Sequence, residues 1–333
     1  MRSSNYIKLK LQTSLLLLVT FCATGQPISG KVIDGATKIP LAYVNIGILG
    51  SPIGTISNED GTFSIFVPST YNQDSIIFSM LGYERRVIPT SQITAQENIT
   101  IHLDEKATKL ETVTVKGNSK KEKTFPLGNR YNQGGLIYCD SIAAGSAMAL
   151  LIENKYPAYH KDLKFPVYAR EARLFISRNT LDSFKVRIRF LSKNPETGLP
   201  DDDLFDESIV LNSSTRHGWI EFDLKPYKLL INDTSFFLAF EWIMDDHDRL
   251  SLLKQYYDYR MSNPNLVTSD TTIISGEKVG VRNYYQFQAG TSFGVSAIPF
   301  SLQNYTCYYR LNSFGKWMRA PGILTARLLV ARE

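Results

Sequence analysis

Residues 29–46 read SGKVIDGATKIPLAYVNI, and residues 54–68 read GTISNEDGTFSIFVP. Apolar and polar residues alternate in both stretches, and short turns rich in Gly, Asp and Asn separate the alternating runs. Alternation of this kind is typical of a β-strand with one buried face. The sequence NEDG at 58–61 predicts a hairpin between strands at 55–57 and 63–67, because Gly supplies the positive φ that the turn requires. The two stretches predict a small antiparallel sandwich.

A third stretch, DSIIFSMLGYERRVI at residues 74–88, continues the pattern, and further short strands are expected at 99–103 and 112–115. Taken in order, the three stretches resemble the carboxypeptidase-regulatory-like domain, a transthyretin-like seven-stranded sandwich common at the front of exported proteins of Gram-negative bacteria. The resemblance covers about residues 26–116 and includes the family's Gly-Tyr corner as Gly82-Tyr83. It implies a domain that is separate from any catalytic domain.

One string in this region resembles a zinc-binding pattern. His102 and Glu105 have the His-x-x-Glu spacing of a carboxypeptidase metal site, which also needs a distant His and a catalytic Glu. On a strand, Glu105 points away from the face that His102 shares with Asp104. We therefore interpret the string as a polar strand end, and the chain is not expected to be a peptidase.

Residues 1–25 have the composition of a targeting signal. A basic start precedes an apolar run at 15–21 and a small-residue ending, which predicts a cleaved signal peptide and a mature start at Gln26. The alternative is lipidation at Cys22, although Phe21 stands where lipoprotein signals prefer a small residue. No later apolar stretch is long enough to predict a transmembrane helix. An exported protein of the periplasm or the outer-membrane surface is expected.

Net charge constrains the class of partner, and the cysteine content leaves two possible states for the thiols. Removing the three basic residues of the signal from the formal net charge of +5 leaves +2, too little to favour a nucleic-acid partner. Cys139 and Cys307 remain after cleavage. They could pair in an oxidising compartment, or they could be two separately buried thiols.

The rest of the chain divides into a polar linker at 117–135 and a second β-rich module at 136–333. Strands are expected in the second module around 147–152, 168–176, 183–190, 208–211, 218–224, 235–243, 305–311 and 322–330. This number of strands suggests a jelly-roll-like sandwich, so the whole chain is predicted to be all-β. The layout of residues 183–243 is similar to carbohydrate-binding jelly rolls, which constrains architecture rather than ligand.

The expected strand at 183–190 has two distinct faces. Phe184, Val186 and Ile188 alternate with basic residues that share the opposite face. Those basic residues are Lys185, Arg187 and Arg189. An antiparallel sheet with its polar side in water is expected here.

Two acidic stretches could bind a metal ion. Asp201 and Asp203 belong to one, and Asp245 and Asp248 to the other. Carboxylates are the hard oxygen ligands that Ca²⁺ prefers, but neither stretch carries an EF-hand pattern. Solvated loops are the alternative, and no other cofactor is expected.

Aromatic residues of the second module could stack on sugar rings. Tyr256, Tyr257 and Tyr259, with Arg260, form the preferred candidate because they fall in a polar stretch expected to be a loop. Others, Trp219 among them, are expected on strands, where half of the side chains point inward.

Paired carboxylates raise the possibility of glycoside hydrolysis. The candidates are Glu221, Asp223, Glu241 and Asp245. Glu221 and Asp223 are expected on the wet face of one strand, and hydrolysis would require two carboxylates flanking a cleft. The sequence favours a non-enzymatic envelope protein that binds a polysaccharide or an outer-membrane protein through its second module. A carbohydrate-active hydrolase is the alternative.

Overall fold

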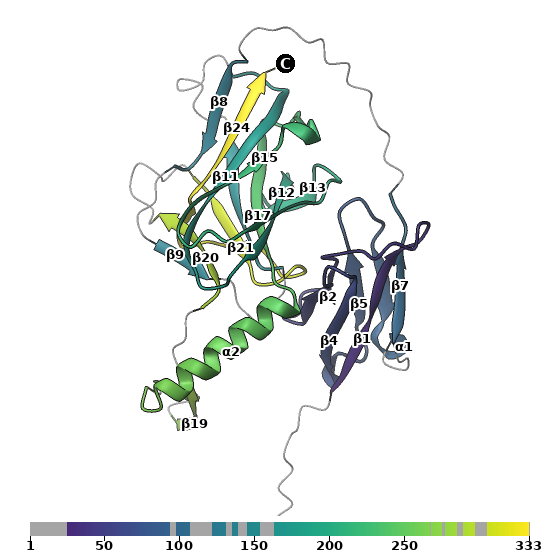
Figure 1. Ribbon diagram of the computed structural model, residues 1–333, viewed down its shortest axis with the longest axis vertical. Helices are drawn as coiled ribbons and strands as arrows, with labels where there is room; N and C mark the ends of the chain where they lie inside the picture. The colour runs from purple at the N-terminus through teal and green to yellow at the C-terminus, as the bar shows by residue number, and fades with distance from the viewer. Residues whose placement is uncertain are drawn as a thin grey trace, which may run out of the picture.

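A computed structural model describes residues 25–93, 98–106, 122–130, 135–138, 145–153, 163–266, 268–274, 277–284, 289–296 and 305–332. These residues form two β-sandwiches, which lie side by side with the long helix α2 beginning near their junction (Figure 1). The prediction of an all-β chain is confirmed, and the jelly-roll topology of the second sandwich stays a prediction. The proposed signal peptide, including Cys22, lies outside the described residues.

The first sandwich contains seven described strands in two sheets, ordered β4-β1-β7 and β3-β2-β5-β6. Their bounds are β1 Gly25–Asp34, β2 Asn45–Ile48, β3 Gly54–Ile56, β4 Thr62–Pro68, β5 Ser75–Ser79, β6 Arg86–Pro89 and β7 Ile99–Leu103. Two short helices, η1 Ser69–Tyr71 and α1 Thr90–Ile93, follow β4 and β6. Alternate apolar side chains from the two sheets meet in one buried core. The strand expected at 112–115 lies outside the described residues.

The turn at residues 58–61 forms, but it does not make the predicted hairpin. Asn58 N donates to Thr62 O at 2.7 Å, and Gly61 adopts a φ of 79°. β3 pairs with β2, however, whereas β4 pairs with β1 in the other sheet. The hairpin prediction is wrong because the turn carries the chain across the sandwich, where each strand finds a different neighbour.

The second sandwich consists of a seven-stranded and an eight-stranded sheet. The seven-stranded sheet contains β10 Ala147–Glu153, β12 Phe184–Lys193, β13 Pro200–Asp203, β14 Ile209–Ser213, β17 Ser235–Ile243, β21 Cys307–Arg310 and β22 Met318–Arg319. The eight-stranded sheet contains β8 Thr124–Gly128, β9 Gly135–Tyr138, β11 Val167–Asn179, β15 Gly218–Asp223, β16 Leu230–Ile231, β20 Thr291–Ser296, β23 Ile323–Leu324 and β24 Ala326–Arg332. The short helix η2, Lys225–Tyr227, follows β15.

The core of the second sandwich lies between these two sheets. Trp242 of β17 stacks on Phe293 of β20 with ring centroids 3.5 Å apart, and its indole N–H donates to Thr291 O at 3.0 Å. Phe125 and Leu127 also belong to this core. They come from β8, which pairs with β24, so residues 124–128 are not part of a polar linker as predicted. Cys307 is a buried free thiol, and Cys139 lies outside the described residues.

The polar face of β12 is buried, not wet as the sequence predicts. Phe184, Val186 and Ile188 do face the core, but Arg187 on the opposite face is only 1% exposed. Its guanidinium donates from Nη2 to Tyr43 O of the first sandwich at 2.6 Å. Alternation distinguishes the two faces of a strand, but it carries no information about a second layer that covers the polar face.

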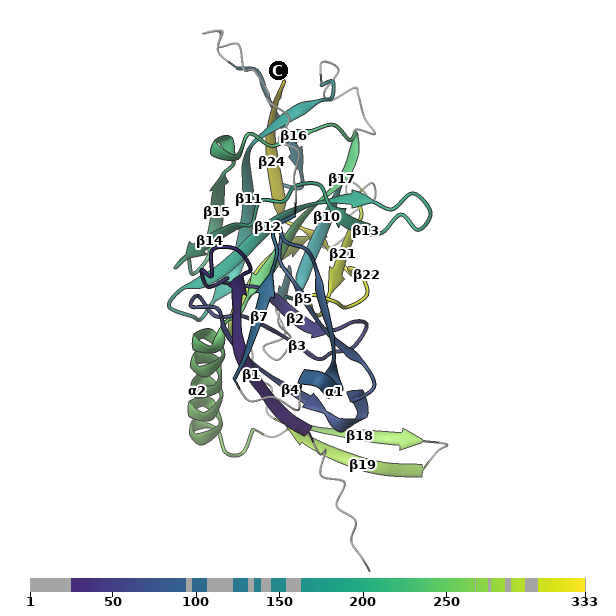
Figure 2. The same ribbon diagram turned by 90° about the vertical axis from the view of Figure 1, so that its right-hand side faces the viewer.

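Several hydrogen bonds hold the first sandwich against the second. Asn58 and Asp246 form a reciprocal pair, in which Asn58 Nδ2 donates to Asp246 Oδ2 at 3.0 Å and Asp246 N donates to Asn58 Oδ1 at 3.1 Å. Further bonds run from Ser313 Oγ to Asn45 Oδ1 at 2.8 Å, from Asn312 Nδ2 to Ser51 O at 3.0 Å and from Gly50 N to Phe314 O at 3.1 Å. In Figures 1 and 2 the end of the first sandwich that carries β2 and β3 lies against the second sandwich.

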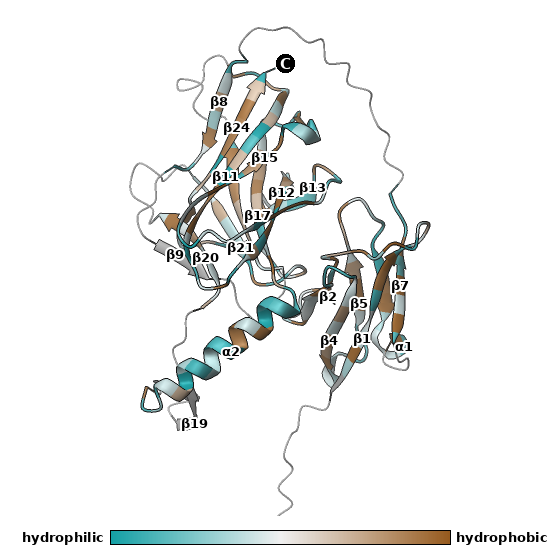
Figure 3. Ribbon diagram, viewed as in Figure 1, coloured by the Kyte–Doolittle hydropathy of each residue, from teal (hydrophilic) through white to brown (hydrophobic). Residues whose placement is uncertain are grey.

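Helix α2, Asp246–Ser262, extends from this junction away from the second sandwich (Figure 1). Asp245 caps its first turn by accepting from Asp248 N at 3.0 Å. Beyond it, β18 Thr268–Ile274 and β19 Glu277–Tyr284 pair as a two-stranded sheet, seen most clearly in Figure 2. Figure 3 shows α2 largely in the hydrophilic colour. Within the described part of the chain, no helix has the length and apolar content to cross a membrane.

Candidate ligand-binding site

The buried arginines of β12 surround one carboxylate. Glu241 of β17 is fully buried and accepts from Arg187 Nη1, Arg189 Nη1 and Arg310 Nη2, each at 2.9 Å. Burial raises the pKa of Glu241, but the charges of the three arginines outweigh it and hold the pKa at about 2. Burial also lowers the pKa of Arg310 to about 10. This arrangement, the Glu241 cluster, is a structural ion network closed to solvent.

The four aspartates predicted to bind metal belong to two separate sets of contacts. Asp203 accepts from Arg189 Nε at 2.8 Å, and Asp201 accepts from Asn194 Nδ2 at 2.8 Å. Asp245 accepts from Lys185 Nζ at 2.8 Å. The exposed Asp201 and the partly buried Asp203 thus contact residues towards the end of β12, whereas Asp245 contacts a residue at its start.

Asp248 lies beside Asp245 at the start of α2. It is 2% exposed, and its Oδ2 is 3.7 Å from Lys185 Nζ. Burial, and then the charge of Asp245, raise the pKa of Asp248 to about 6. Burial also acts to raise the pKa of Asp245, but the hydrogen bonds from Lys185 and Asp248 N and the charge of Lys185 together outweigh it and lower that pKa. Among the described residues no group of three or more His, Cys, Asp or Glu side chains is arranged to hold a metal ion, so a Ca²⁺ site stays a prediction.

Tyr256, Tyr257, Tyr259 and Arg260 lie on α2 and not in a loop. The helix forms because Asp245 caps it and the segment contains no Gly or Pro. Tyr257 is 52% exposed, and its ring meets that of Tyr256 edge-on with centroids 5.8 Å apart. Tyr259 is partly buried and Arg260 is exposed. These side chains project from a convex helix, so their role as a sugar platform stays a prediction.

The outer face of the eight-stranded sheet has a different character. β11 turns Glu171, Arg173 and Phe175 outward, because Ala172, Leu174 and Ile176 face the core. β15 stands antiparallel to β11, so that Phe175 is opposite Trp219 and Arg173 is opposite Glu221. We call this surface, with β24 and β8 on its other side, the open face.

Charged side chains occupy the middle of the open face. Arg173 donates from Nε to Glu171, and its Nη2 lies 3.1 Å from Glu221 Oε1. The hydrogen bond from Arg173 to Glu171 raises the pKa of the arginine. The side chains of Arg173 and Glu221 are 39% and 52% exposed, so this pair is in contact with water.

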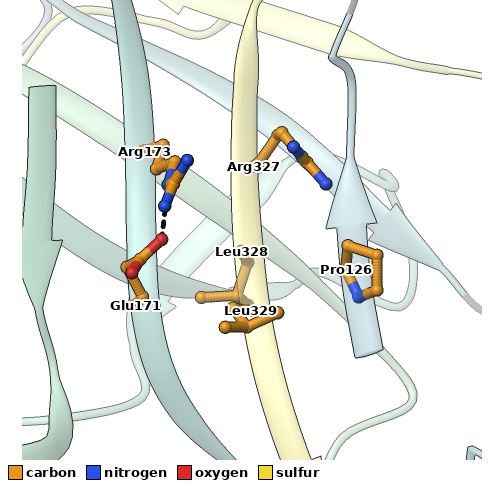
Figure 4. Close-up of a pocket in the computed structure, with 6 residues that line it drawn as sticks. All are labelled: Pro126, Glu171, Arg173, Arg327, Leu328 and Leu329. Carbon is orange, nitrogen blue, oxygen red and sulfur yellow. Dashed lines mark hydrogen bonds and ion pairs between the residues drawn. The ribbon is translucent and has the colours of Figure 1, made fainter. Parts of the chain in front are cut away.

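A shallow hollow lies next to this pair on the β24 side. Its lining residues come from β11, β24 and β8: Glu171, Arg173, Arg327, Leu328, Leu329 and Pro126 (Figure 4). Its volume of about 150 Å³ is below the range of about 300–1,000 Å³ for drug-sized ligands. The hollow therefore suits one sugar ring or a group of similar size.

Aromatic rings stand at one end of the open face. Phe175 packs edge-on against Trp219, with centroids 5.4 Å apart, and against His217, with centroids 5.1 Å apart. Trp219 remains partly exposed. An exposed indole, a guanidinium and carboxylates on one flat sheet are groups that can contact the apolar face and the hydroxyls of a sugar.

The comparison with protein families concerns the first sandwich. Residues 28–115 match the model of the CarboxypepD_reg-like domain. This regulatory-like domain is non-catalytic and often extracellular. The match confirms the resemblance of residues 26–116, and it ends before the second sandwich begins. No curated protein shows significant similarity to the chain.

The structure of the regulatory-like domain agrees with the interpretation of its motifs. Gly82 adopts a φ of 81° at the corner, and Tyr83 donates to Asp34 Oδ2 at 3.0 Å. Burial raises the pKa of Tyr83 to about 12. His102 Nδ1 lies 3.4 Å from Lys38 Nζ, and Glu105 is exposed next to Tyr83. These contacts fit a polar strand end.

The centre of the open face was not predicted from the sequence. Glu221 and Asp223 were expected on a wet face, and both are exposed there. Arg173 and Arg327 were not among the expected site residues, although both stand in stretches where charged and apolar residues alternate. Their meeting depends on strand order, which local alternation does not contain.

Proposed function

We propose that this chain is an exported accessory protein of the cell envelope that binds polysaccharide on the open face of its second sandwich. The regulatory-like domain supports this proposal because it is non-catalytic and often extracellular. The observation that carries it is the row formed by Trp219, Arg173, Glu221 and the neighbouring hollow. The hydrogen-bonded junction makes the regulatory-like domain a fixed support for the second sandwich.

The contacts of the carboxylates in the second sandwich favour binding over hydrolysis. Glu241 is closed inside three arginines, and Asp245 is paired with Lys185 at the start of α2. Glu171 and Glu221 are accessible, but both contact Arg173 on an open sheet surface. A glycosidase uses two carboxyl groups on opposite sides of the scissile bond, usually within a cleft that encloses the sugar.

The test is affinity electrophoresis of the full chain through gels that contain a panel of polysaccharides. Retardation by at least one polymer is expected, and Trp219→Ala should weaken it about fivefold, equivalent to about 1 kcal/mol for a lost aromatic contact. Tyr257→Ala is the matched control on α2. If Tyr257→Ala weakens retardation and Trp219→Ala does not, the site lies on α2. Shortening of the polymer during the run would support a hydrolase.

A protein partner is the second candidate, and α2 carries the observation that favours it. Leu250, Leu253, Tyr257 and Met261 recur at intervals of three and four residues and are 66%, 49%, 52% and 79% exposed. An apolar stripe of this kind is typical of helices that pack against another protein. A photo-crosslinker at position 253 in cells should then give a discrete adduct, whereas one at the exposed Glu196 should not. Failure to form the adduct would contradict this candidate.

A further inference from the structure

The hollow on the open face brings two arginines together. Arg173 of β11 and Arg327 of β24 are direct cross-strand partners on the same side of the sheet. Like charges in this position destabilise a sheet unless other groups compensate them. Figure 4 shows Arg173 joined to Glu171 on one side of the hollow, and Arg327 on the other side, towards Pro126.

Only one of these two charges is compensated within the protein. Arg173 contacts Glu171 and Glu221 on the side away from β8. The guanidinium of Arg327 has no hydrogen-bond or ion-pair partner within the part of the chain that the structure describes. It is nevertheless only partly exposed, so its guanidinium loses some hydration without gaining a carboxylate.

Gly128 of β8 stands opposite Arg327 and presents no side chain that could pair with its guanidinium. Gly128 adopts a φ of 89°, and a Cβ at this position would lie 2.6 Å from Ala326 O, so the glycine permits the close approach of β8 to β24. Pro126 and Leu329 supply apolar surface in the same hollow. A small anionic group attached to an apolar ring face therefore fits here.

We propose that Arg327, with Arg173 beside it, binds the carboxylate of an acidic sugar, so that the ligand of the open face is an acidic polysaccharide. This inference rests on the proposed polysaccharide-binding function and names its ligand class. The planar fork of a guanidinium matches a carboxylate with two parallel hydrogen bonds. Pro126 and Leu329 contact the carbons of the sugar ring that carries it.

Acidic residues flank the two arginines on the open face. Glu221 and Asp223 come from β15, on the opposite side of β11 from β24, and Glu171 lines the hollow beside Arg173. A carboxylate that approaches from the β8 side therefore meets Arg327 with the least repulsion from these acids.

The experiment compares polygalacturonate with the same polymer after methyl esterification, using affinity electrophoresis of the full chain. The two polymers share a backbone and differ in charge. Polygalacturonate should retard the chain more, and Arg327→Gln should weaken its binding about tenfold, the effect of one charge-assisted hydrogen-bonded pair. Arg319→Gln, an exposed arginine of β22 in the other sheet, removes the same charge and should have no effect.

Two further measurements distinguish the loss of a binding contact from a folding defect in Arg327→Gln. Arg327→Lys keeps the charge but loses the fork, and it should retain an intermediate affinity. Free galacturonate should displace polygalacturonate from the unmodified chain, and this result needs no variant at all. Galacturonate that fails to compete overturns the inference.

The remaining outcomes separate this inference from the function on which it rests. Equal binding of both polymers, with loss only in Trp219→Ala, would keep polysaccharide binding and overturn the acidic ligand. A phosphomannan that binds through Arg327 while polygalacturonate does not would overturn the carboxylate in favour of a phosphate. No binding of any polymer would overturn both proposals.

Discussion

The second sandwich carries the same cross-strand motif on its two outer faces. Arg187 stands opposite Glu241 in the seven-stranded sheet, and Arg173 stands opposite Glu221 in the eight-stranded sheet. The first pair is covered by the regulatory-like domain, and its side chains are 1% and 0% exposed, whereas the second is exposed to water. An arginine opposite a glutamate is thus a buried structural pair in one sheet and a solvent-accessible pair in the other. The difference arises because the regulatory-like domain covers the first pair and leaves the second uncovered.

The largest expected effect comes from removing the buried carboxylate. Glu241→Gln leaves three buried guanidinium groups without their shared anion, so the free energy of unfolding should fall by about 3–5 kcal/mol. Urea titration followed by tryptophan fluorescence measures this change. If the variant unfolds at the same urea concentration as the unmodified chain, the Glu241 cluster does not stabilise the junction.

A pH-dependent effect is expected next, at Asp248 near the start of β12. Its folded pKa of about 6 lies above its ordinary value of 3.8, so the folded state favours the protonated form. The resulting stability is fully present below 3.8 and is lost as the pH rises through about 6. Asp248→Asn, which stays neutral, should therefore be about 1–2 kcal/mol more stable than the unmodified chain at pH 8, with a smaller difference at pH 5.

Asp245→Asn is the matched control for this variant. The pKa of Asp245 is lowered, so its ionised form stabilises the fold, and that contribution is present above its ordinary pKa and lost in acid. Asn still caps the helix, which confines the change to the ion pair with Lys185. Thermal unfolding at both pH values should show Asp245→Asn destabilised at pH 8. The same sign for both variants would contradict the assignment of the two carboxylates.

The smallest effect on stability is expected at the open face. Glu221→Gln removes one contact of an exposed arginine that keeps Glu171, so unfolding should change by less than about 1 kcal/mol. The same urea titration, carried out on Glu221→Gln and Glu241→Gln, compares the two losses of unfolding free energy. Comparable losses in the two variants would mean that the open face is as tightly coupled to the fold as the covered one.

Local patterns in the sequence predicted the strands well, and the reason is physical. A strand such as β12 or β15 shows its buried face through alternation, which depends only on residues next to each other in sequence. What covers the other face depends on contacts between distant residues. Arg187 was therefore expected in water, although Tyr43 and Glu241 enclose it.

The helix and the candidate site were harder to predict for related reasons. In α2, Leu250, Leu253 and Met261 recur at helical spacing, but the charged residues and tyrosines around them give the segment the polar composition that was interpreted as a loop. The charged groups of the open face come from β11, β15 and β24. Glu221 was expected on a wet face, but its pairing with Arg173 depends on register, which the sequence pattern leaves undetermined.

The contact between Arg187 and Tyr43 limits which other regulatory-like domains could replace the first sandwich of this protein. Tyr43 has a φ of 61°, a left-handed conformation that is uncommon for a bulky side chain, and its carbonyl accepts from the buried guanidinium at 2.6 Å. A regulatory-like domain taken from another protein would have to present a carbonyl at the same point, or Arg187 would lose its partner. The two domains are therefore expected to be inherited together and to resist exchange by gene fusion.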